Sequence, residues 1–202
     1  KDLHKKRASP GFEHPAHIQT KRIAGGEGIK CDIQVDLWAQ CGDTTLPFYD
    51  ALHRTGEGVR HILTRDERHA AYMADGYARV SGRVGVCMAQ SVGAANLAAG
   101  LQDAYLHRAP VVALTGRKEP MLRYRNAYQE VPHTPLYASV TKASMDVAEA
   151  RELPHLLAQA FRQASDGSPR PVHLDLNGLG GEVIEKGEVT NPVIPPAALG
   201  RL

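Results

Sequence analysis

The carboxyl group of Glu67 is the clearest candidate for proton transfer in this sequence. It follows a strand-like segment at 59–63 and opens a segment with helical periodicity at 67–80. A carboxyl group partly shielded from water can give and take a proton near neutral pH. The helix dipole alone also favours a glutamate in a first helical turn. Taken alone, Glu67 therefore leaves a catalytic and a structural interpretation open.

Two further loops could form a site together with Glu67. Segments 39–45 and 90–96 each follow a strand-like run and precede a helix-like one. In open α/β sheets, ligands bind at the carboxyl ends of strands, where helix N-termini present free N–H groups. Segment 90–96 lacks both the Gly-Lys-Ser/Thr ending of a P-loop and the GxGxxG pattern. A tight turn with small residues for packing also explains each loop when it is taken alone.

The elements that would position these loops alternate along the chain. Strand character and helical periodicity recur in turn. The strand-like segments are 33–38, 59–63, 84–89, 111–115 and 172–176, and the helix-like ones 67–80, 94–106 and 148–164. The alternation predicts an α/β three-layer sandwich with a mostly parallel central sheet and helices on both faces.

Composition and charge argue against several classes of function. Of the 202 residues, 43% are hydrophobic and 23% charged, as in soluble globular proteins. The 24 basic and 22 acidic side chains nearly balance, so we expect no nucleic-acid partner. Apolar stretches fall short of the roughly 18 residues that span a bilayer. The N-terminal segment also lacks the apolar core of a signal peptide, so we expect no membrane partner.

The cysteines and the ends of the chain give further expectations. Cys31, Cys41 and Cys87 form no Cys-x-x-Cys pair, so neither a disulfide framework nor a zinc site is predicted. Unpaired thiols fit a reducing, cytoplasmic location. We interpret 1–30 as a polar lead-in arm, 31–186 as the α/β domain and 187–202 as a proline-containing linker or tail.

The order of several short motifs resembles a known family. The segment that Glu67 opens contains Gly-Tyr-Ala-Arg, and four further motifs follow it. They are Gly-Ala-Ala-Asn-Leu at 93–97, Asp-Ala-Tyr at 103–105, Ala-Pro-Val-Val-Ala-Leu-Thr-Gly at 109–116 and Ala-Tyr-Gln-Glu at 127–130. From about residue 37 to 183 the chain resembles the pyrimidine-binding (PYR) domain of thiamine diphosphate enzymes, the acetolactate synthase and decarboxylase superfamily.

The resemblance implies that Glu67 is a catalytic proton relay. In that family the matching glutamate hydrogen-bonds a nitrogen of the cofactor's aminopyrimidine ring and shifts the ring to its imino tautomer. The imino group then removes the C2 proton of the thiazolium, which gives the ylid nucleophile. The cofactor supplies the organic chemistry and the protein orients it.

The resemblance also implies a set of cofactor-binding residues. Gly42 matches a glycine whose backbone approaches the pyrimidine, and Val92 matches the residue that packs on the ring. Gly93 and Asn96 match the end of the same loop. Gln129 matches a glutamine that reaches towards the reacting centre.

The chain departs from the family pattern at several of these places. The family often has Gly-Pro-Gly where this chain has Ser-Val-Gly at 91–93, and Arg117 replaces a common glutamine. Asp66 stands where a histidine is frequent. Its carboxylate could favour the protonated form of Glu67 or could cap the helix, and we expect the cap. Gly76 lies within the predicted helix, where glycine costs about 1 kcal/mol relative to alanine. The resemblance suggests close packing at that position.

The resemblance implies that half of the site lies elsewhere. In the family, Mg²⁺ holds the diphosphate on a second domain, through a Gly-Asp-Gly motif and a later Asn. The run 165–167, Ser-Asp-Gly, with Asn191 has the wrong first residue, so we assign no metal ligand in this chain. Family active sites form between the PYR domain of one subunit and the diphosphate-binding domain of another. The expected partners are therefore a diphosphate-binding domain or subunit and a second copy, in a homodimer through the PYR domain.

Three functions remain open at this point. The first is the PYR half of a 2-oxo acid decarboxylase or carboligase, inactive alone, either excised from a longer protein or a small subunit of a split enzyme. The second is a non-catalytic or regulatory module, against which the presence of Glu67 argues. The third is a generic nucleotide-binding domain, for which segment 40–43 is a poor phosphate loop.

Overall fold

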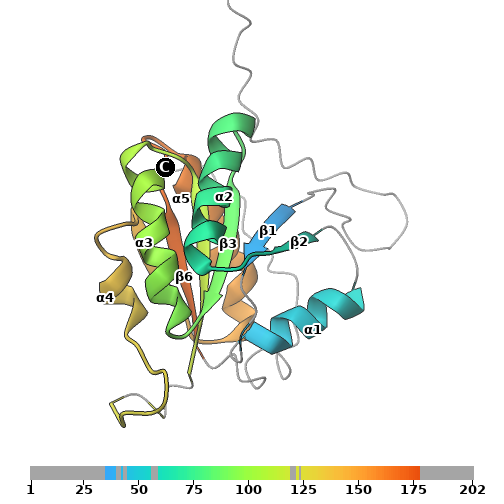
Figure 1. Cartoon of the computed structure of the whole chain (residues 1–202), viewed down its shortest axis with the longest axis vertical. Helices are drawn as coiled ribbons and strands as arrows, with labels where there is room; N and C mark the ends of the chain where they lie inside the picture. The colour runs from blue at the N-terminus through green and yellow to red at the C-terminus, as the bar shows by residue number, and fades with distance from the viewer. Residues whose placement is uncertain are drawn as a thin grey trace, which may run out of the picture. The chain divides into compact units, whose positions relative to one another are not determined.

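Strands and helices alternate throughout the described part of the chain (Figure 1). The computed structural model describes residues 35–39, 42, 45–55, 59–118, 122 and 124–177. The elements are β1 (Val35–Ala39), α1 (Leu46–Thr55), β2 (Val59–Leu63), α2 (Glu67–Ser81), β3 (Gly85–Gln90), α3 (Gly93–Leu106), β4 (Val111–Arg117), α4 (His133–Tyr137), β5 (Ala143–Val147), a 3-10 turn (Ala150–Glu152), α5 (Leu153–Ser165) and β6 (Val172–Asn177). The predicted arm at 1–30 and tail at 187–202 lie outside the described residues.

The six described strands form one sheet in the order β2-β1-β3-β4-β6-β5. Every neighbouring pair is parallel. The carboxyl ends of all these strands therefore meet at one edge, where the loops that open the next helices also lie. The predicted α/β class and parallel sheet are confirmed.

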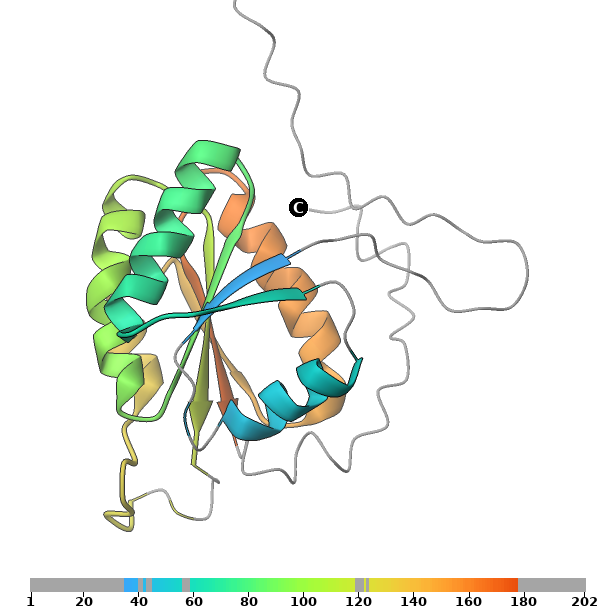
Figure 2. The ribbon, with the colours of Figure 1, turned by 45° about the vertical axis from the view of Figure 1, so that its right-hand side comes forward.

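The direction of each connection along the sheet decides which face its helix covers. The connections β2 to β3, β3 to β4 and β4 to β5 step one way, and α2, α3 and α4 pack on one face. The connections β1 to β2 and β5 to β6 step the other way, and α1 and α5 pack on the opposite face (Figure 2). Right-handed crossovers require this division. It produces the predicted three layers.

The two faces of the sheet are packed differently. Against α2 and α3 the core is rich in alanine, which lets these helices lie close together. Against α5 and α1 it is built from larger side chains, with Leu37, Met88 and Leu174 of the sheet fully or nearly fully buried. The close contact of α2 with α3 fixes their N-termini, which carry the candidate site.

Three elements differ from the sequence-based expectations. The helix predicted over 148–164 is present but starts later, as α5 at Leu153, after a 3-10 turn, with Pro154 in its first turn. Strand β5 and helix α4 were not predicted. Strand β5 is a short edge strand of five residues whose alternation of polar with apolar residues was overlooked, and the five residues of α4 are too few to show helical periodicity.

Two helical glycines provide a matched test of the α2–α3 contact. A Cβ atom at Gly100 would lie 2.7 Å from Ala71 Cβ and 2.8 Å from the Arg68 carbonyl oxygen. At Gly76 nothing described lies within 4 Å of such an atom, so the close packing expected there is absent from the described residues.

We expect Gly100→Ala to lower the free energy of unfolding by about 1–3 kcal/mol through overpacking. We expect Gly76→Ala to raise it by about 0.5–1 kcal/mol. Urea unfolding measures both, and equal effects would contradict the packing described.

Candidate functional site

The site lies where neighbouring strands send their chains in opposite directions. From β1 the chain turns to β2 at one side, whereas from β3, which pairs with β1, it turns to β4 at the other. Such a switch point leaves a crevice at the carboxyl edge of a sheet, where α/β proteins bind ligands. Gly42 follows β1, the turn at 91–92 follows β3, and Glu67 follows the adjacent β2.

Asp66 and Glu67 have separate roles at the start of α2. Asp66 is the N-cap, and its Oδ1 accepts a hydrogen bond from the Arg68 backbone N–H at 2.8 Å. The side chain of Arg68 donates to both carboxylate oxygens and lowers the pKa of Asp66 to about 2. The expected cap is confirmed. The Asp66 carboxylate forms its ion pair with the Arg68 guanidinium group.

The carboxyl group of Glu67 is held between two residues of α3. Glu67 is half-buried, and Asn96 Nδ2 donates to its Oε2 at 3.1 Å. A Cβ atom at Gly93 would lie 2.3 Å from Glu67 Oε1, so only glycine permits this approach. The structure therefore brings together three of the residues singled out from the sequence.

Val92 directly precedes Gly93, and Gly42 approaches the end of the neighbouring strand β3. The Val92 side chain is 49% exposed, although it immediately precedes the buried Gly93. A Cβ atom at Gly42 would lie 2.1 Å from Cγ of Gln90, the last residue of β3. The absence of a side chain at Gly42 thus lets the loop after β1 approach the end of β3. An exposed apolar residue beside a half-buried carboxyl group suits a flat, partly polar ring.

Gln129 lies in a different environment. It is in the turn before α4, with a positive φ of 62°, and its Nε2 donates to the Tyr128 hydroxyl at 3.3 Å. In the described part of the chain no hydrogen bond joins Gln129 to Glu67. The structure does not bring Gln129 into the Glu67 group.

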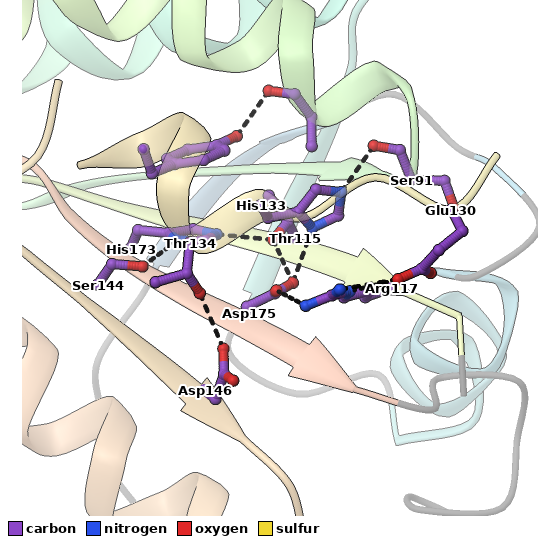
Figure 3. Close-up of polar contacts among 12 residues, drawn as sticks. Ser91, Thr115, Arg117, Glu130, His133, Thr134, Ser144, Asp146, His173 and Asp175 are labelled. Atoms are coloured by element: carbon purple, nitrogen blue, oxygen red, sulfur yellow. Dashed lines mark hydrogen bonds and ion pairs between the residues drawn. The ribbon is translucent and has the colours of Figure 1, made fainter. Parts of the chain in front are cut away.

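A buried polar cluster, which was not predicted from the sequence, lies beneath α4 (Figure 3). Asp175 of β6 is 0% exposed, and its Oδ1 accepts hydrogen bonds from Thr115 at 2.9 Å and from His133 Nδ1 at 2.8 Å. His173 Nε2 lies 2.7 Å from Thr115 Oγ1, and its Nδ1 lies 2.7 Å from Ser144 Oγ. One set of directions satisfies these contacts: Ser144 donates to His173, His173 to Thr115, and Thr115 to Asp175.

Burial and neighbouring charge set the ionisation of two of these residues. Burial lowers the pKa of His173 to about 3, so the ring is neutral, as the bond directions require. Burial acts to raise the pKa of Asp175. The hydrogen bond and charge of His133, with smaller contributions from His173 and Thr115, outweigh burial and bring that pKa below its ordinary value.

Arg117 belongs to the same cluster and is already paired. Its Nε and Nη2 donate to Glu130 Oε1 at 3.1 and 2.7 Å, and its Nη1 lies 3.6 Å from Asp175 Oδ2. The guanidinium group is thus occupied by two buried carboxylates. The replacement of a common glutamine by Arg117 adds a cation whose charge is neutralised inside the protein.

Comparison with known proteins decides the family. Residues 35–136 match the thiamine pyrophosphate enzyme, N-terminal TPP binding domain. The chain belongs to this family. The match includes β1 to α3 and all the site residues proposed from the sequence.

Acetolactate synthases are among the relatives of this thiamine pyrophosphate enzyme domain. It is 41% identical over 151 residues to a probable acetolactate synthase large subunit of Methanocaldococcus jannaschii, a match covering 74% of this chain and 24% of the relative. It is 45% identical over 136 residues to acetolactate synthase isozyme 2 large subunit of Escherichia coli, covering 67% of this chain and 24% of the relative. The chain thus spans about a quarter of the length of these relatives.

The buried cluster has a sequence signal in the alternation of β6. In β6 every residue is buried, yet Val172, Leu174 and Leu176 alternate with His173, Asp175 and Asn177. In a strand buried on both faces, polar residues on one face require polar partners on the element that covers it. The sequence analysis predicted the strand over 172–176 but not its polar face.

The described residues contain no group of three or more His, Cys, Asp or Glu side chains arranged to hold a metal ion. Asp166 and Gly167 precede β6 and so lie towards the amino edge of the parallel sheet, opposite Glu67, and Asn191 is outside the described residues. None of the described helices has the length and apolar character of a membrane-spanning segment.

Burial of neutral His173 predicts how stability depends on pH in this thiamine pyrophosphate enzyme domain. Its pKa falls from 6.5 to about 3 on folding, so the unfolded chain alone takes up the proton between these values. This contribution to stability is present above pH 6.5 and is lost as the pH falls towards 3, by up to about 1.4 kcal/mol per pH unit. We expect a flatter dependence for His173→Phe, whose ring can still stack on Tyr137. Urea unfolding over this range measures it, and identical slopes would contradict a buried, neutral His173.

Proposed function

We propose that this chain is the pyrimidine-binding half of a thiamine diphosphate-dependent enzyme of the acetolactate synthase type, with Glu67 as its proton relay. The observation that carries the proposal is the placement of the Glu67 carboxyl group. Asn96 and the backbone at Gly93 hold it at the sheet's switch point, beside exposed Val92. A generic nucleotide-binding domain would instead need a phosphate loop there.

The residues present suit the cofactor's pyrimidine ring. The ring has polar edges and an apolar face, so it requires a carboxyl group at an edge and an apolar contact on the face. Glu67 and Val92 supply these two contacts from adjacent loops, and Gly42 lets the loop after β1 come close. When bound, thiamine diphosphate supplies a carbon nucleophile once its C2 proton has been removed.

Each residue of the chain contributes a distinct physical effect. The amide of Asn96 fixes the orientation of the Glu67 carboxyl group through Oε2. Oε1 lies against Gly93, where no side chain blocks approach, and is the atom we assign to hold or release the proton. Val92 excludes water from the ring face and so strengthens the polar contact at the edge. Gln129 is proposed to reach the reacting centre once the site is complete.

The remainder of the site is proposed to belong to another part of the enzyme. The chain spans about a quarter of the acetolactate synthases it resembles, so a diphosphate-binding half has room in the rest. We assign Mg²⁺ and the diphosphate to that half, and we infer a homodimer through this domain and a cytoplasmic location. The isolated chain is accordingly expected to be inactive. A chain encoded alone would be the small subunit of a split enzyme.

The proton-relay role is tested by Glu67→Gln in the assembled protein. The chain is joined to its diphosphate-binding half, encoded downstream or taken from an acetolactate synthase relative, and exchange of the cofactor's C2 proton is followed by NMR. A positioned acid–base group contributes about 10²–10⁴-fold, so we expect exchange to slow by at least about 100-fold. Glutamine keeps the size and polarity of the side chain but cannot transfer the proton.

Asp66→Asn is the matched control for this experiment. It removes the neighbouring carboxylate, while asparagine remains a good N-cap. We expect C2 proton exchange close to that of the unaltered protein. Full exchange in Glu67→Gln would refute the relay and favour a non-catalytic PYR-like module.

A further inference from the structure

Two side chains of α4 bind the backbone at the start of α3. His133 Nε2 lies 2.9 Å from the Ser91 carbonyl oxygen (Figure 3). The Tyr137 hydroxyl donates to the Ala94 carbonyl at 2.9 Å. Both side chains are 0% exposed. They are four residues apart and so lie on the same side of the helix. Helix α4 therefore contacts the turn that carries Val92 and Gly93 at two points.

The turn held in this way is strained at Ser91. Its φ is +36°, a region that residues other than glycine rarely adopt, so the backbone there is strained. Ser91 is restrained on both sides. Its N–H donates to the Gly116 carbonyl at 2.7 Å, and its carbonyl accepts from His133 and from the Ala94 N–H at 3.1 Å. Loss of the His133 bond removes one of the contacts that oppose relaxation of this strain.

Both ring nitrogens of His133 face hydrogen-bond acceptors. Nδ1 faces the Asp175 carboxylate and Nε2 faces the Ser91 carbonyl oxygen. Both bonds form only when both nitrogens carry hydrogen, which makes the ring an imidazolium. The surrounding charges agree, because Arg117 pairs with Glu130 and His133 then balances Asp175. The other groups packed here, His173 and Tyr137, are neutral.

The geometry points to His133 as a positioning residue for the Glu67 site: its doubly hydrogen-bonded imidazolium, anchored on Asp175, holds the strained Ser91 turn and thereby keeps Gly93 against the Glu67 carboxyl group. The positioning rests on the contacts of this chain alone. Its consequence for catalysis rests on the function proposed above for Glu67.

A pair of amide variants separates the two bonds of His133. The Nε2 of glutamine reaches roughly the position of the ring Nε2, so His133→Gln keeps a donor for the Ser91 carbonyl. The shorter His133→Asn keeps a donor near Asp175 only. In the 202-residue chain, amide exchange of Ala94 and Ala95 reports the first turn of α3, because both donate within the turn, at 3.1 Å. The reference is the amide of Gly85, at the opposite end of β3, whose N–H donates to the Pro110 carbonyl.

We expect His133→Asn to speed exchange at Ala94 and Ala95 by about tenfold or more relative to Gly85, as for loss of a charged hydrogen bond. His133→Gln should restore at least part of the protection. In the assembled enzyme, His133→Asn should lower kcat more than it changes KM, with partial rescue by His133→Gln. The proposal would be overturned if His133→Asn changed the exchange rates of Ala94, Ala95 and Gly85 by the same factor. It would also be overturned if Ala94 and Ala95 were no better protected in His133→Gln than in His133→Asn. Amide exchange is measured without the cofactor. Its result therefore tests the positioning role of His133 independently of the relay role of Glu67.

A measurement on the unaltered chain covers the case in which His133→Asn does not fold. Nitrogen-15 NMR of the histidine rings at neutral pH distinguishes an imidazolium from a neutral ring. The expected result is hydrogen on both nitrogens of His133 and on Nε2 alone in His173. A neutral His133 ring would mean that one of its two bonds is not formed, and this too would overturn the proposal.

Discussion

The buried carboxylate of Asp175 constrains much of the structure around it. A buried charge without partners costs several kcal/mol, so the chain must bring donors to it. Two elements provide its partners. Thr115 of β4 and His133 of α4 donate hydrogen bonds, and the Arg117 guanidinium group at the end of β4 forms an ion pair at 3.6 Å. The carboxylate therefore requires α4 to lie on this part of the sheet. It also explains why a five-residue helix is retained between β4 and β5.

The face of the sheet that carries α2, α3 and α4 combines two kinds of packing. Beneath α2 and α3 it is apolar and dominated by alanine, which allows a close helix pair and places Gly93 against Glu67. Beneath α4 it is polar and hydrogen-bonded. The turn at 91–92 lies where the two kinds of packing meet. On the polar side, His133 binds the Ser91 carbonyl, and on the apolar side the next residue, Gly93, lies against the Glu67 carboxyl group. The precision of the Glu67 site thus depends on a cluster that does not contact Glu67.

The parts that could be predicted from the sequence are those with long, regular patterns. Periodicity located α2, α3 and the central strands, and the order of the motifs from Glu67 to 127–130 indicated the family. Asn96 and Gly93 could be assigned to the site because they lie in that motif and share a helix N-terminus. The cap at Asp66 was predictable because it depends only on the residues that follow it.

The parts that could not be predicted depend on contacts between distant segments. His133, Thr115 and Asp175 are far apart in sequence and become partners only when β4, β6 and α4 pack together. The place of Gln129 depends on a turn at positive φ that no local pattern encodes. The expected packing at Gly76 was wrong for the described residues, because it was taken from resemblance and not from a contact.

We propose that Glu67 contacts the pyrimidine ring of a cofactor whose diphosphate is held by another part of the enzyme. It is tested most directly by a crystal structure of this chain assembled with its diphosphate-binding half, thiamine diphosphate and Mg²⁺. The account predicts a Glu67 carboxyl oxygen within hydrogen-bond distance of a ring nitrogen, about 2.6–3.2 Å, and Val92 against the ring face. A ring bound away from Glu67, or metal ligands supplied by this chain, would contradict it.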